Sequence, residues 1–163
     1  MQHYDLIIIG NGLAGASMAQ ALKHLPLSIA IIDRASSTNG ELINDNTLNT
    51  RPITLNHTSV NVLKTLNIWS KLAEASIAIE QLIITEQSRL GQIALSAASM
   101  RLDALAHVVP YADLETQLHN ASDNQLAIEH LTSTKLIAIE NSDSIVTVCY
   151  QDQQQHQHQL SAS

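Results

Sequence analysis

Residues 4–15 read YDLIIIGNGLAG, a short apolar run that ends in three closely spaced glycines. The run is rich in β-branched residues, which predicts a buried strand over residues 5–9. Strong helix formers over residues 13–25, stopped by Pro26, predict a helix, and a second apolar run over residues 27–33 predicts another strand. Strand, helix and strand in this order make one βαβ unit, with parallel strands and a right-handed crossover.

The glycine spacing Gly10-x-Gly12-x-x-Gly15 matches the fingerprint of dinucleotide-binding turns. Gly10 permits the tight turn out of the strand, Gly12 lets backbone approach a pyrophosphate, and Gly15 lets the helix pack closely on the strand. The pyrophosphate is expected on the N–H groups at the helix N-terminus. Asp33 ends the second strand eighteen residues after Gly15, where an acid accepts hydrogen bonds from ribose hydroxyls. A carboxylate repels a 2′-phosphate, so NAD or FAD is expected rather than NADP; the alternative is a structural turn without a ligand.

The overall composition excludes several classes of protein. The chain has 163 residues, a formal net charge of −7 and no basic patch, which argues against binding to nucleic acid. A single cysteine, Cys149, excludes an internal disulfide framework. No apolar run reaches the roughly 18 residues that span a membrane, and no leader precedes the first strand, so a cytoplasmic location is expected.

The remainder of the chain does not continue the βαβ repeat. A long polar loop over residues 34–50 is followed by predicted helices, a hairpin and a β-meander of three strands, LAIEHL, TKLIAIE and SIVTVCYQD. The Gln-rich end, QDQQQHQHQLSAS, is either a last strand of the meander or frayed. The helices are expected over residues 57–67, 69–75 and 112–121, and the hairpin strands over residues 77–86 and 92–97.

This interrupted topology is typical of FAD-binding oxidoreductases, whereas an NAD-dependent dehydrogenase usually continues with βαβ repeats. The chain resembles the N-terminal part of the flavin-dependent aromatic hydroxylases, the p-hydroxybenzoate-hydroxylase-like group, and is most similar to the hydroxylases of ubiquinone biosynthesis. The resemblance lies in YDLIIIGNGLAGASMAQAL, IAIIDR, HVVPYADLETQL and, most specifically, NTRPITLNHTSVNVLKTLNIW. It implies an α/β fold: an FAD-binding, Rossmann-like domain with a parallel sheet and a β-meander, truncated in this chain.

The resemblance also implies which residues bind FAD. The glycine turn and the first helical turn would line the pyrophosphate, Asp33 would hold the adenosine ribose, and Arg34 would flank the adenine. Arg51 would reach the phosphates, a role that suits the forked donors of a guanidinium; the alternative is a surface arginine in a polar loop. The implied cofactor-binding residues are Gly10, Gly12, Leu13, Ala14, Gly15, Asp33, Arg34 and Arg51.

The activity implied by the resemblance is hydroxylation of a polyprenylated phenol, a small-molecule substrate, with FAD as cofactor, NAD(P)H as reductant and O₂ as oxidant. Because that substrate is a lipid, peripheral association with the inner membrane is implied for the parent protein, without a transmembrane segment. The residues identify no catalytic base and no oligomeric state.

The chain departs from the family at three positions. Asn49 stands where an acid is common, Asn67 where a glycine ends the helix, and Tyr111 where an Asn or Arg lies near the flavin. Asn tolerates the left-handed conformation of a helix end, so the change at Asn67 is mild. The change at Tyr111 leaves the role of that position open.

The domain organisation follows from the same resemblance. Residues 1–76 and 99–163 are assigned to a partial FAD-binding domain, and residues 77–98 to the first hairpin of a substrate domain. Two Gly-Asp motifs that come later in the family do not occur in this sequence. The chain is therefore expected to be an N-terminal fragment that is incompetent as a hydroxylase on its own.

Other motifs carry weaker signals. His156 and His158 are the only close pair among eight histidines, and without a Cys, Asp or Glu partner pattern they do not predict a metal site. Cys149 is expected to be a small buried residue, and Trp69 is expected to pack beneath its helix. Three alternatives remain open: an NAD-binding Rossmann oxidoreductase fragment, an inactive remnant that binds nothing tightly, and another flavoprotein such as an amine oxidase.

Overall fold

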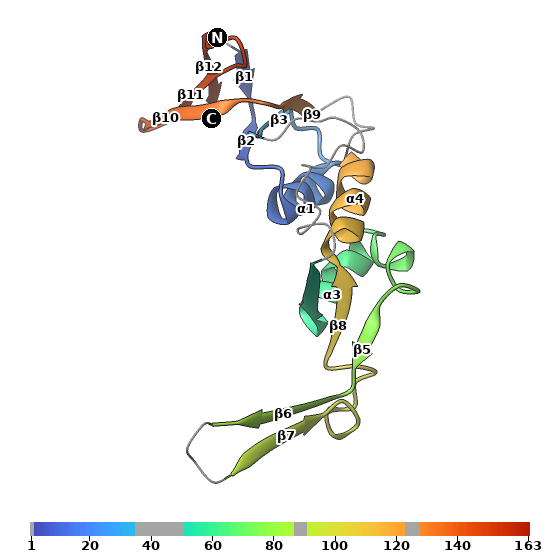
Figure 1. Cartoon of the computed structure of the whole chain (residues 1–163). Helices are drawn as coiled ribbons and strands as arrows, with labels where there is room; N and C mark the ends of the chain where they lie inside the picture. The colour runs from blue at the N-terminus through green and yellow to red at the C-terminus, as the bar shows by residue number, and fades with distance from the viewer. Residues whose placement is uncertain (1, 35–50, 87–90, 123–127) are drawn as a thin grey trace. The chain divides into compact units, whose positions relative to one another are not determined.

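The computed structural model of the chain describes residues 2–34, 51–86, 91–122 and 128–163. The chain forms two compact units, one made of residues 1–44 and 118–163 and the other of residues 45–117. Figure 1 traces the chain through both units. Of the polar loop expected over residues 34–50, only Arg34 lies within the described residues, and Asn49 lies outside them.

The first unit contains the predicted βαβ unit. Strand β2 (Leu6–Ile9), helix α1 (Leu13–Leu22) and strand β3 (Ile29–Ile32) follow one another along the chain. The two strands pair in parallel, with Ile8 opposite Ile31. The sequence prediction of a βαβ unit is therefore confirmed.

One strand that the sequence places in the meander belongs to the parallel sheet instead. Strand β9 (Ile128–Leu131) pairs in parallel with β3, which gives the strand order β2-β3-β9. The prediction of LAIEHL as a meander strand is wrong because a short apolar strand carries no information about its partner. Here the partner is the remaining edge of β3, whose four residues are all buried.

The second sheet of this unit is the meander. Strand β1 pairs in parallel with β12 and the other neighbours are antiparallel, so the order is β1-β12-β11-β10. The Gln-rich end of the chain forms a strand of this sheet, and β1 was not predicted from the sequence. The strands are β1 (Gln2–Tyr4), β10 (Lys135–Asn141), β11 (Val146–Gln151) and β12 (Gln157–Ala162).

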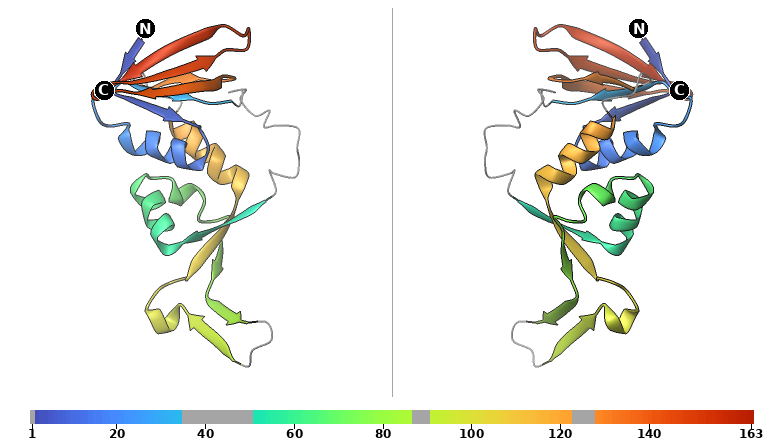
Figure 2. Two further views of the ribbon diagram at one scale, coloured as in Figure 1. Left: turned by 90° about the vertical axis from the view of Figure 1, so that its left-hand side faces the viewer. Right: turned by 90° about the vertical axis from the view of Figure 1, so that its right-hand side faces the viewer.

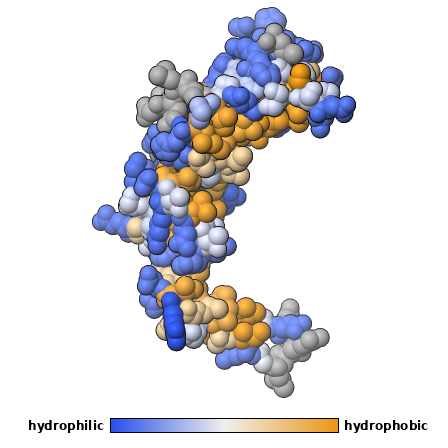
Figure 3. Space-filling view, turned by 180° about the vertical axis from the view of Figure 1, so that it is seen from behind, coloured by the Kyte–Doolittle hydropathy of each residue, from blue (hydrophilic) through white to orange (hydrophobic). Residues whose placement is uncertain are grey.

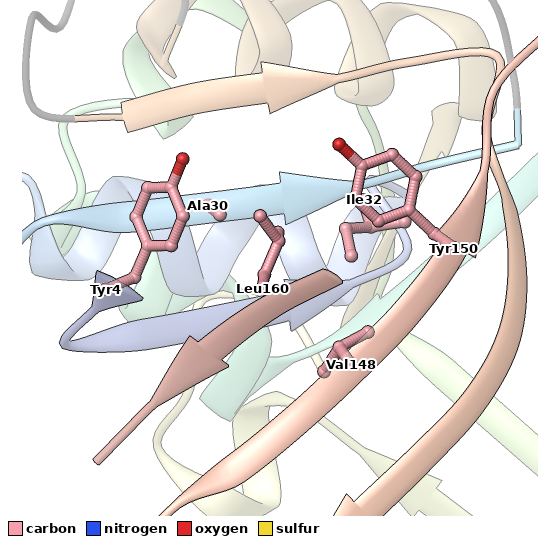
Figure 4. Close-up of a cluster of buried hydrophobic side chains, with 6 residues drawn as sticks. All are labelled: Tyr4, Ala30, Ile32, Val148, Tyr150 and Leu160. Atoms are coloured by element: carbon pink, nitrogen blue, oxygen red, sulfur yellow. The ribbon is translucent and has the colours of Figure 1, made fainter. Parts of the chain in front are cut away.

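The two faces of β3 define the two cores of the first unit. Ile29 and Ile31 pack on Ala19 of α1, and Ala30 and Ile32 face the meander sheet, so the parallel sheet lies between the helix and the second sheet (Figure 2). Figure 4 shows the core between the sheets, which comes from four strands. Its buried residues are Tyr4, Ala30, Ile32, Val148, Tyr150 and Leu160.

A polar contact also joins the two sheets. The hydroxyl of Tyr4, on β1, donates a hydrogen bond to the carboxylate of Glu129, on β9, over 2.5 Å. Burial, together with this carboxylate, raises the pKa of the Tyr4 phenol above its usual value of 10.0. The ring therefore stays protonated and serves as a donor throughout the physiological range.

The second unit is built on a three-stranded antiparallel sheet. Its order is β4-β8-β5, with β4 (Pro52–Asn56), β8 (Ala106–Pro110) and β5 (Ile77–Ile79). Helix α3 (His57–Thr65) follows β4, and Val60 and Leu63 are its buried residues. The short helices are η1 (Trp69–Lys71) and η2 (Ala98–Met100), and helix α4 (Tyr111–Ser122) leads from this unit into the first.

The end of α3 has the predicted left-handed residue. Asn67 has a φ of 59°, and the N–H of Ile68 bonds back to the carbonyl of Leu63 at 2.9 Å. This is the geometry in which glycine or asparagine ends a helix. The buried Trp69 follows and meets the ring of His107 edge to face, with 4.9 Å between ring centroids. The expectation that Trp69 packs in the interior is confirmed.

The hairpin predicted over residues 77–97 is shorter than expected. Strand β6 (Gln81–Thr85) pairs with β7 (Gln92–Ser96), as predicted, but residues 77–79 form β5 and pair with β8 in the other sheet. The single strand expected over residues 77–86 is therefore wrong, because the chain changes partner at Glu80. Apolar side chains of the hairpin lie exposed and form an apolar surface on it (Figure 3).

Candidate functional site

The glycine turn joins the end of β2 to the start of α1. Gly10 has a φ of +95°, a conformation that L side chains rarely adopt, and its N–H bonds to the carbonyl of Ile32 at 2.8 Å. Gly12 is the N-cap of α1, with extended backbone. The tight turn that the sequence predicts at Gly10 is thus present.

The three glycines meet different surroundings. A Cβ built on Gly15 would lie 1.9 Å from the carbonyl oxygen of Gly10 and 3.2 Å from a methyl carbon of Ile8. Within the described parts of the chain, a Cβ on Gly10 or on Gly12 would meet nothing within 4 Å. Gly15 therefore serves the close packing of helix on strand, and Gly12 leaves space beside the turn, as the fingerprint requires.

The N-terminus of α1 offers backbone donors to an anion. The first bond of the helix runs from the N–H of Ala16 to the carbonyl of Gly12 at 2.9 Å, so the N–H groups of Leu13, Ala14 and Gly15 have no acceptor within the helix. Among the residues that the structure describes, no side chain caps this end, and the first turn holds no acidic residue. A pyrophosphate fits such an end, because the N–H groups and the helix dipole both favour negative charge.

Asp33 is held against the glycine turn. Its carboxylate oxygen Oδ2 accepts a short hydrogen bond from the N–H of Asn11. The carbonyl of Asp33 accepts bonds from the N–H of Thr134 at 2.9 Å and from its hydroxyl at 3.0 Å. The structure thus brings together the glycines and the acid that the sequence singles out, although they are 22 residues apart at the Asn11–Asp33 contact.

Two residues that contact this region were not predicted. Thr134 anchors the end of β3, and the ring Nε2–H of His119 donates to the carbonyl oxygen of Asn11 at 2.6 Å. His119 lies 108 residues from Asn11 in the sequence, on α4. The one available signal is a histidine beside Leu118 on a predicted amphipathic helix, and that signal does not name a partner.

Asn11 has one more notable group. Its side-chain Oδ1 is buried and has no hydrogen-bond partner among the described residues. Buried acceptors are normally paired with protein groups or with ordered water. The donors of α1, the open space at Gly12 and the carboxylate of Asp33 together form a site whose chemistry fits the adenosine diphosphate part of FAD.

The two arginines differ in their surroundings. Arg34 is exposed directly after Asp33. Arg51 belongs to the second unit, where its guanidinium carbon lies 4.8 Å from the centroid of the Tyr111 ring. Its carbonyl accepts the N–H of Tyr111 at 2.9 Å. Tyr111, one of the three departures from the family pattern, therefore contacts Arg51. The role of Arg51 toward phosphate stays a prediction.

The histidine pair has a partner that the sequence did not suggest. Asp152 Oδ2 lies 2.8 Å from Nε2 of His158 and 3.6 Å from Nδ1 of His156. Among the described residues, no group of three or more His, Cys, Asp and Glu side chains is arranged to hold a metal ion. Cys149, expected to be buried, is only half-buried, because its strand alternates between the core and a more open face.

Within the described parts of the chain, every helix is too short or too polar to cross a bilayer. The longest of these described helices, α4, has 12 residues.

Solved structures with a similar fold include monooxygenases. The chain aligns over 98% of its length with the flavin-dependent monooxygenase PieE, determined with FAD and substrate, at a TM-score of 0.74 and 14% identity. It aligns over 99% with p-nitrophenol 4-monooxygenase PnpA from Pseudomonas putida (TM-score 0.74, 11% identity). It also aligns over 99% with the OxyS anhydrotetracycline hydroxylase from Streptomyces rimosus (TM-score 0.75, 15% identity).

The chain spans only part of these proteins, 29% of PieE, 39% of PnpA and 30% of OxyS. At such low identities the likeness shows the fold alone. The sequence itself matches a family described as FAD binding domain over residues 3–163, which is nearly the whole chain. This chain therefore belongs to the FAD binding domain family and has the fold of the FAD-binding part of flavin-dependent monooxygenases.

Proposed function

We propose that this chain is the FAD-binding part of a monooxygenase that hydroxylates a polyprenylated phenol in ubiquinone biosynthesis. The observation that carries the FAD assignment is the juxtaposition of the glycine turn, the uncapped N-terminus of α1 and the carboxylate of Asp33, in a chain that matches the FAD binding domain family. The polyprenylated substrate is supported by the resemblance of residues 49–69 to the ubiquinone hydroxylases.

In this proposal the chain's own residues bind and orient the cofactor. The N–H groups at the start of α1 hold the pyrophosphate, Asp33 holds the ribose, Arg34 lies beside the adenine, and Arg51 supplies a forked cation to the phosphates. Flavin supplies the redox chemistry when it is bound. Overall, one atom of O₂ enters the phenol and the other leaves as water, while NAD(P)H is oxidised to NAD(P)⁺ and one proton is consumed.

The exposed hairpin supports the proposal that this chain is part of a larger protein. Ile83 and Ile93 are 59% and 61% exposed, although both lie in regular strands. Isolated two-stranded hairpins are marginal, and apolar strand faces are normally covered. We propose that further strands of a substrate domain pack there, and that the whole protein works in the cytoplasm at the surface of the inner membrane.

The proposal is tested first on the purified chain. FAD, NAD and ADP-ribose are titrated separately, with heat and flavin fluorescence as readouts. Binding of FAD and ADP-ribose supports the proposal, tighter binding of NAD than of FAD favours a dehydrogenase fragment, and no heat from any of the three favours an inactive remnant.

The substrate is tested on the whole protein that the gene encodes. Incubation with a polyprenylated phenol, NAD(P)H and ¹⁸O₂ should yield a product heavier by one labelled oxygen atom. A phenol without the prenyl chain is the matched control. Equal turnover of both phenols, or of neither, would remove the ubiquinone assignment while leaving FAD binding intact.

A further inference from the structure

The peptide groups on the two sides of Asn11 are held by two different side chains. The N–H of Asn11 donates to Asp33 Oδ2, and the carbonyl of Asn11 accepts from Nε2–H of His119 at 2.6 Å. These groups belong to consecutive peptide planes of the glycine turn, 10–11 and 11–12. Both planes are therefore fixed from outside the turn.

The second of these bonds sets the direction of a donor. All described peptide bonds are trans, and in a trans peptide the carbonyl of one residue and the N–H of the next point in opposite directions. With the oxygen of Asn11 held by His119, the N–H of Gly12 must point away from α4. The turn is also open beside Gly12, since a Cβ there would meet no described atom within 4 Å.

The side chain of His119 is itself held in place. It sits near the end of α4, and the preceding residue, Leu118, is 1% exposed and so fixes this turn of the helix in the first unit. A donor on a packed helix holds its acceptor more tightly than one on a loop. By contrast, Gly10 and Gly12 have no side chains with which to stabilise the turn.

We propose that His119 is a positioning residue of the FAD site, which fixes the Asn11–Gly12 peptide so that the Gly12 N–H is presented to the pyrophosphate. This role depends on the proposed binding of FAD at the glycine turn. His119 acts through the backbone and touches no part of the cofactor. Its effect should therefore fall on ligands that carry a diphosphate and spare ligands that do not.

The test compares three variants of the full chain. In His119→Gln, the amide nitrogen reaches about as far as the ring Nε2 and can still donate. In His119→Leu the hydrogen-bond donor is lost. The matched control is His24→Leu, which changes an exposed histidine just after α1. Affinities for FAD, ADP and adenosine are measured by calorimetry.

We expect His119→Leu to lower the affinities for FAD and ADP by about three- to tenfold, the range for losing one neutral hydrogen bond. The affinity for adenosine should fall by less than about twofold. His119→Gln and His24→Leu should stay within about twofold for all three. Equal loss for adenosine and ADP would overturn the proposal, as would full affinity in His119→Leu or a loss in His119→Gln as large as that in His119→Leu.

A second measurement needs no ligand. The ¹⁵N–¹H signal of Gly12 should move in His119→Leu and return toward its original position in His119→Gln, because the peptide plane is released and then held again. An unmoved Gly12 signal would overturn the positioning role even in a chain that binds FAD. If the chain without substitutions binds neither FAD nor ADP, the proposed function fails. The Gly12 signal still decides in that case whether His119 holds the turn.

Discussion

A Cβ placed on Gly15 would come within 1.9 Å of the carbonyl oxygen of Gly10. Real Cβ atoms do not approach other atoms so closely, and the obstacle is backbone rather than a movable side chain. A Cβ placed on Gly12, three residues earlier, would meet no described atom within 4 Å. The two glycines therefore have separable roles, Gly15 in packing α1 on β2 and Gly12 in leaving room for a ligand.

This relationship predicts that two matched substitutions affect different properties, one the stability of the chain and the other its affinity for FAD. Gly15→Ala should lower the free energy of unfolding by about 1–3 kcal/mol or prevent folding, because the helix must move off the strand. Gly12→Ala should leave the free energy of unfolding within about 1 kcal/mol but weaken FAD binding, because its methyl group occupies the space beside the turn. Denaturant unfolding and calorimetric titration measure the two quantities. Equal destabilisation by both would show that the turn has no open side.

Asp33 should determine whether a 2′-phosphate is tolerated. The chain without substitutions should bind ADP-ribose more tightly than 2′-phosphorylated ADP-ribose, because the carboxylate repels the added charge. Asp33→Asn keeps an oxygen for the Asn11 N–H but loses the charge. This substitution should therefore lower the affinity for ADP-ribose by about three- to tenfold and reduce the difference in affinity between ADP-ribose and its 2′-phosphorylated form. The control is Asp5→Asn, since Asp5 bonds instead to Ser28. An unchanged ratio in Asp33→Asn would place the ribose elsewhere.

The βαβ unit and the glycine turn could be predicted because their determinants are local. Strand, turn and helix are specified within residues 5–33, and the helix end at Asn67 is likewise set by its neighbours. Strand partners were harder to predict from the sequence, because Ile128–Leu131 could join either sheet. Its pairing with β3 depends on the free edge that β3 offers in the folded chain.

Long-range contacts could not be predicted from the sequence for the same reason. No local pattern links His119 to the carbonyl of Asn11 or Asp152 to His158 across a hairpin. Ile77–Ile79 and Gln81–Thr85 form one continuous apolar segment in the sequence, yet they pair in different sheets. Such partner choices depend on which edges the folded chain leaves open, which a single short strand does not encode.

Tyr111 should couple energetically to Arg51. The guanidinium lies over the ring at 4.8 Å, a cation–π geometry worth about 0.5–1 kcal/mol at an exposed site. A double-mutant cycle with Arg51→Gln and Tyr111→Leu, measured on the free energy of unfolding, should return a coupling of about that size. Tyr111→Phe should preserve the coupling because the ring face remains. A coupling indistinguishable from zero would mean that the contact contributes nothing to stability.

The exposed hairpin should limit the solubility of the isolated chain. Ile84 and Ile93 are directly opposite one another in β6 and β7, and they are 47% and 61% exposed. The double substitution Ile84→Thr with Ile93→Thr keeps β-branched residues while removing apolar surface. It should raise the soluble fraction and reduce binding of a hydrophobic dye, with ADP affinity unchanged.

A buried isoleucine gives the contrast for this experiment. Ile31 is 1% exposed in β3, so Ile31→Thr should destabilise the first unit instead of improving solubility. If the hairpin substitutions also destabilise the chain or leave the soluble fraction unchanged, the hairpin surface is not what drives association.

Acid should weaken the β11–β12 turn through Asp152. The hydrogen bond from His158 lowers the pKa of this carboxyl below its usual value of 3.8, and the N–H groups of Gln154 and His156, both 2.9 Å from Oδ1, act in the same direction. A lowered folded-state pKa contributes stability that is fully present above pH 3.8 and is lost as the pH falls through the folded value. The unfolding temperature of the parent chain should therefore exceed that of Asp152→Asn at neutral pH, and the two should converge in acid. Asp103→Asn, which changes an exposed aspartate of the other unit, is the control for loss of one carboxylate outside this turn. A constant difference between the parent and Asp152→Asn down to the lowest pH would show that the carboxylate charge does not stabilise the turn.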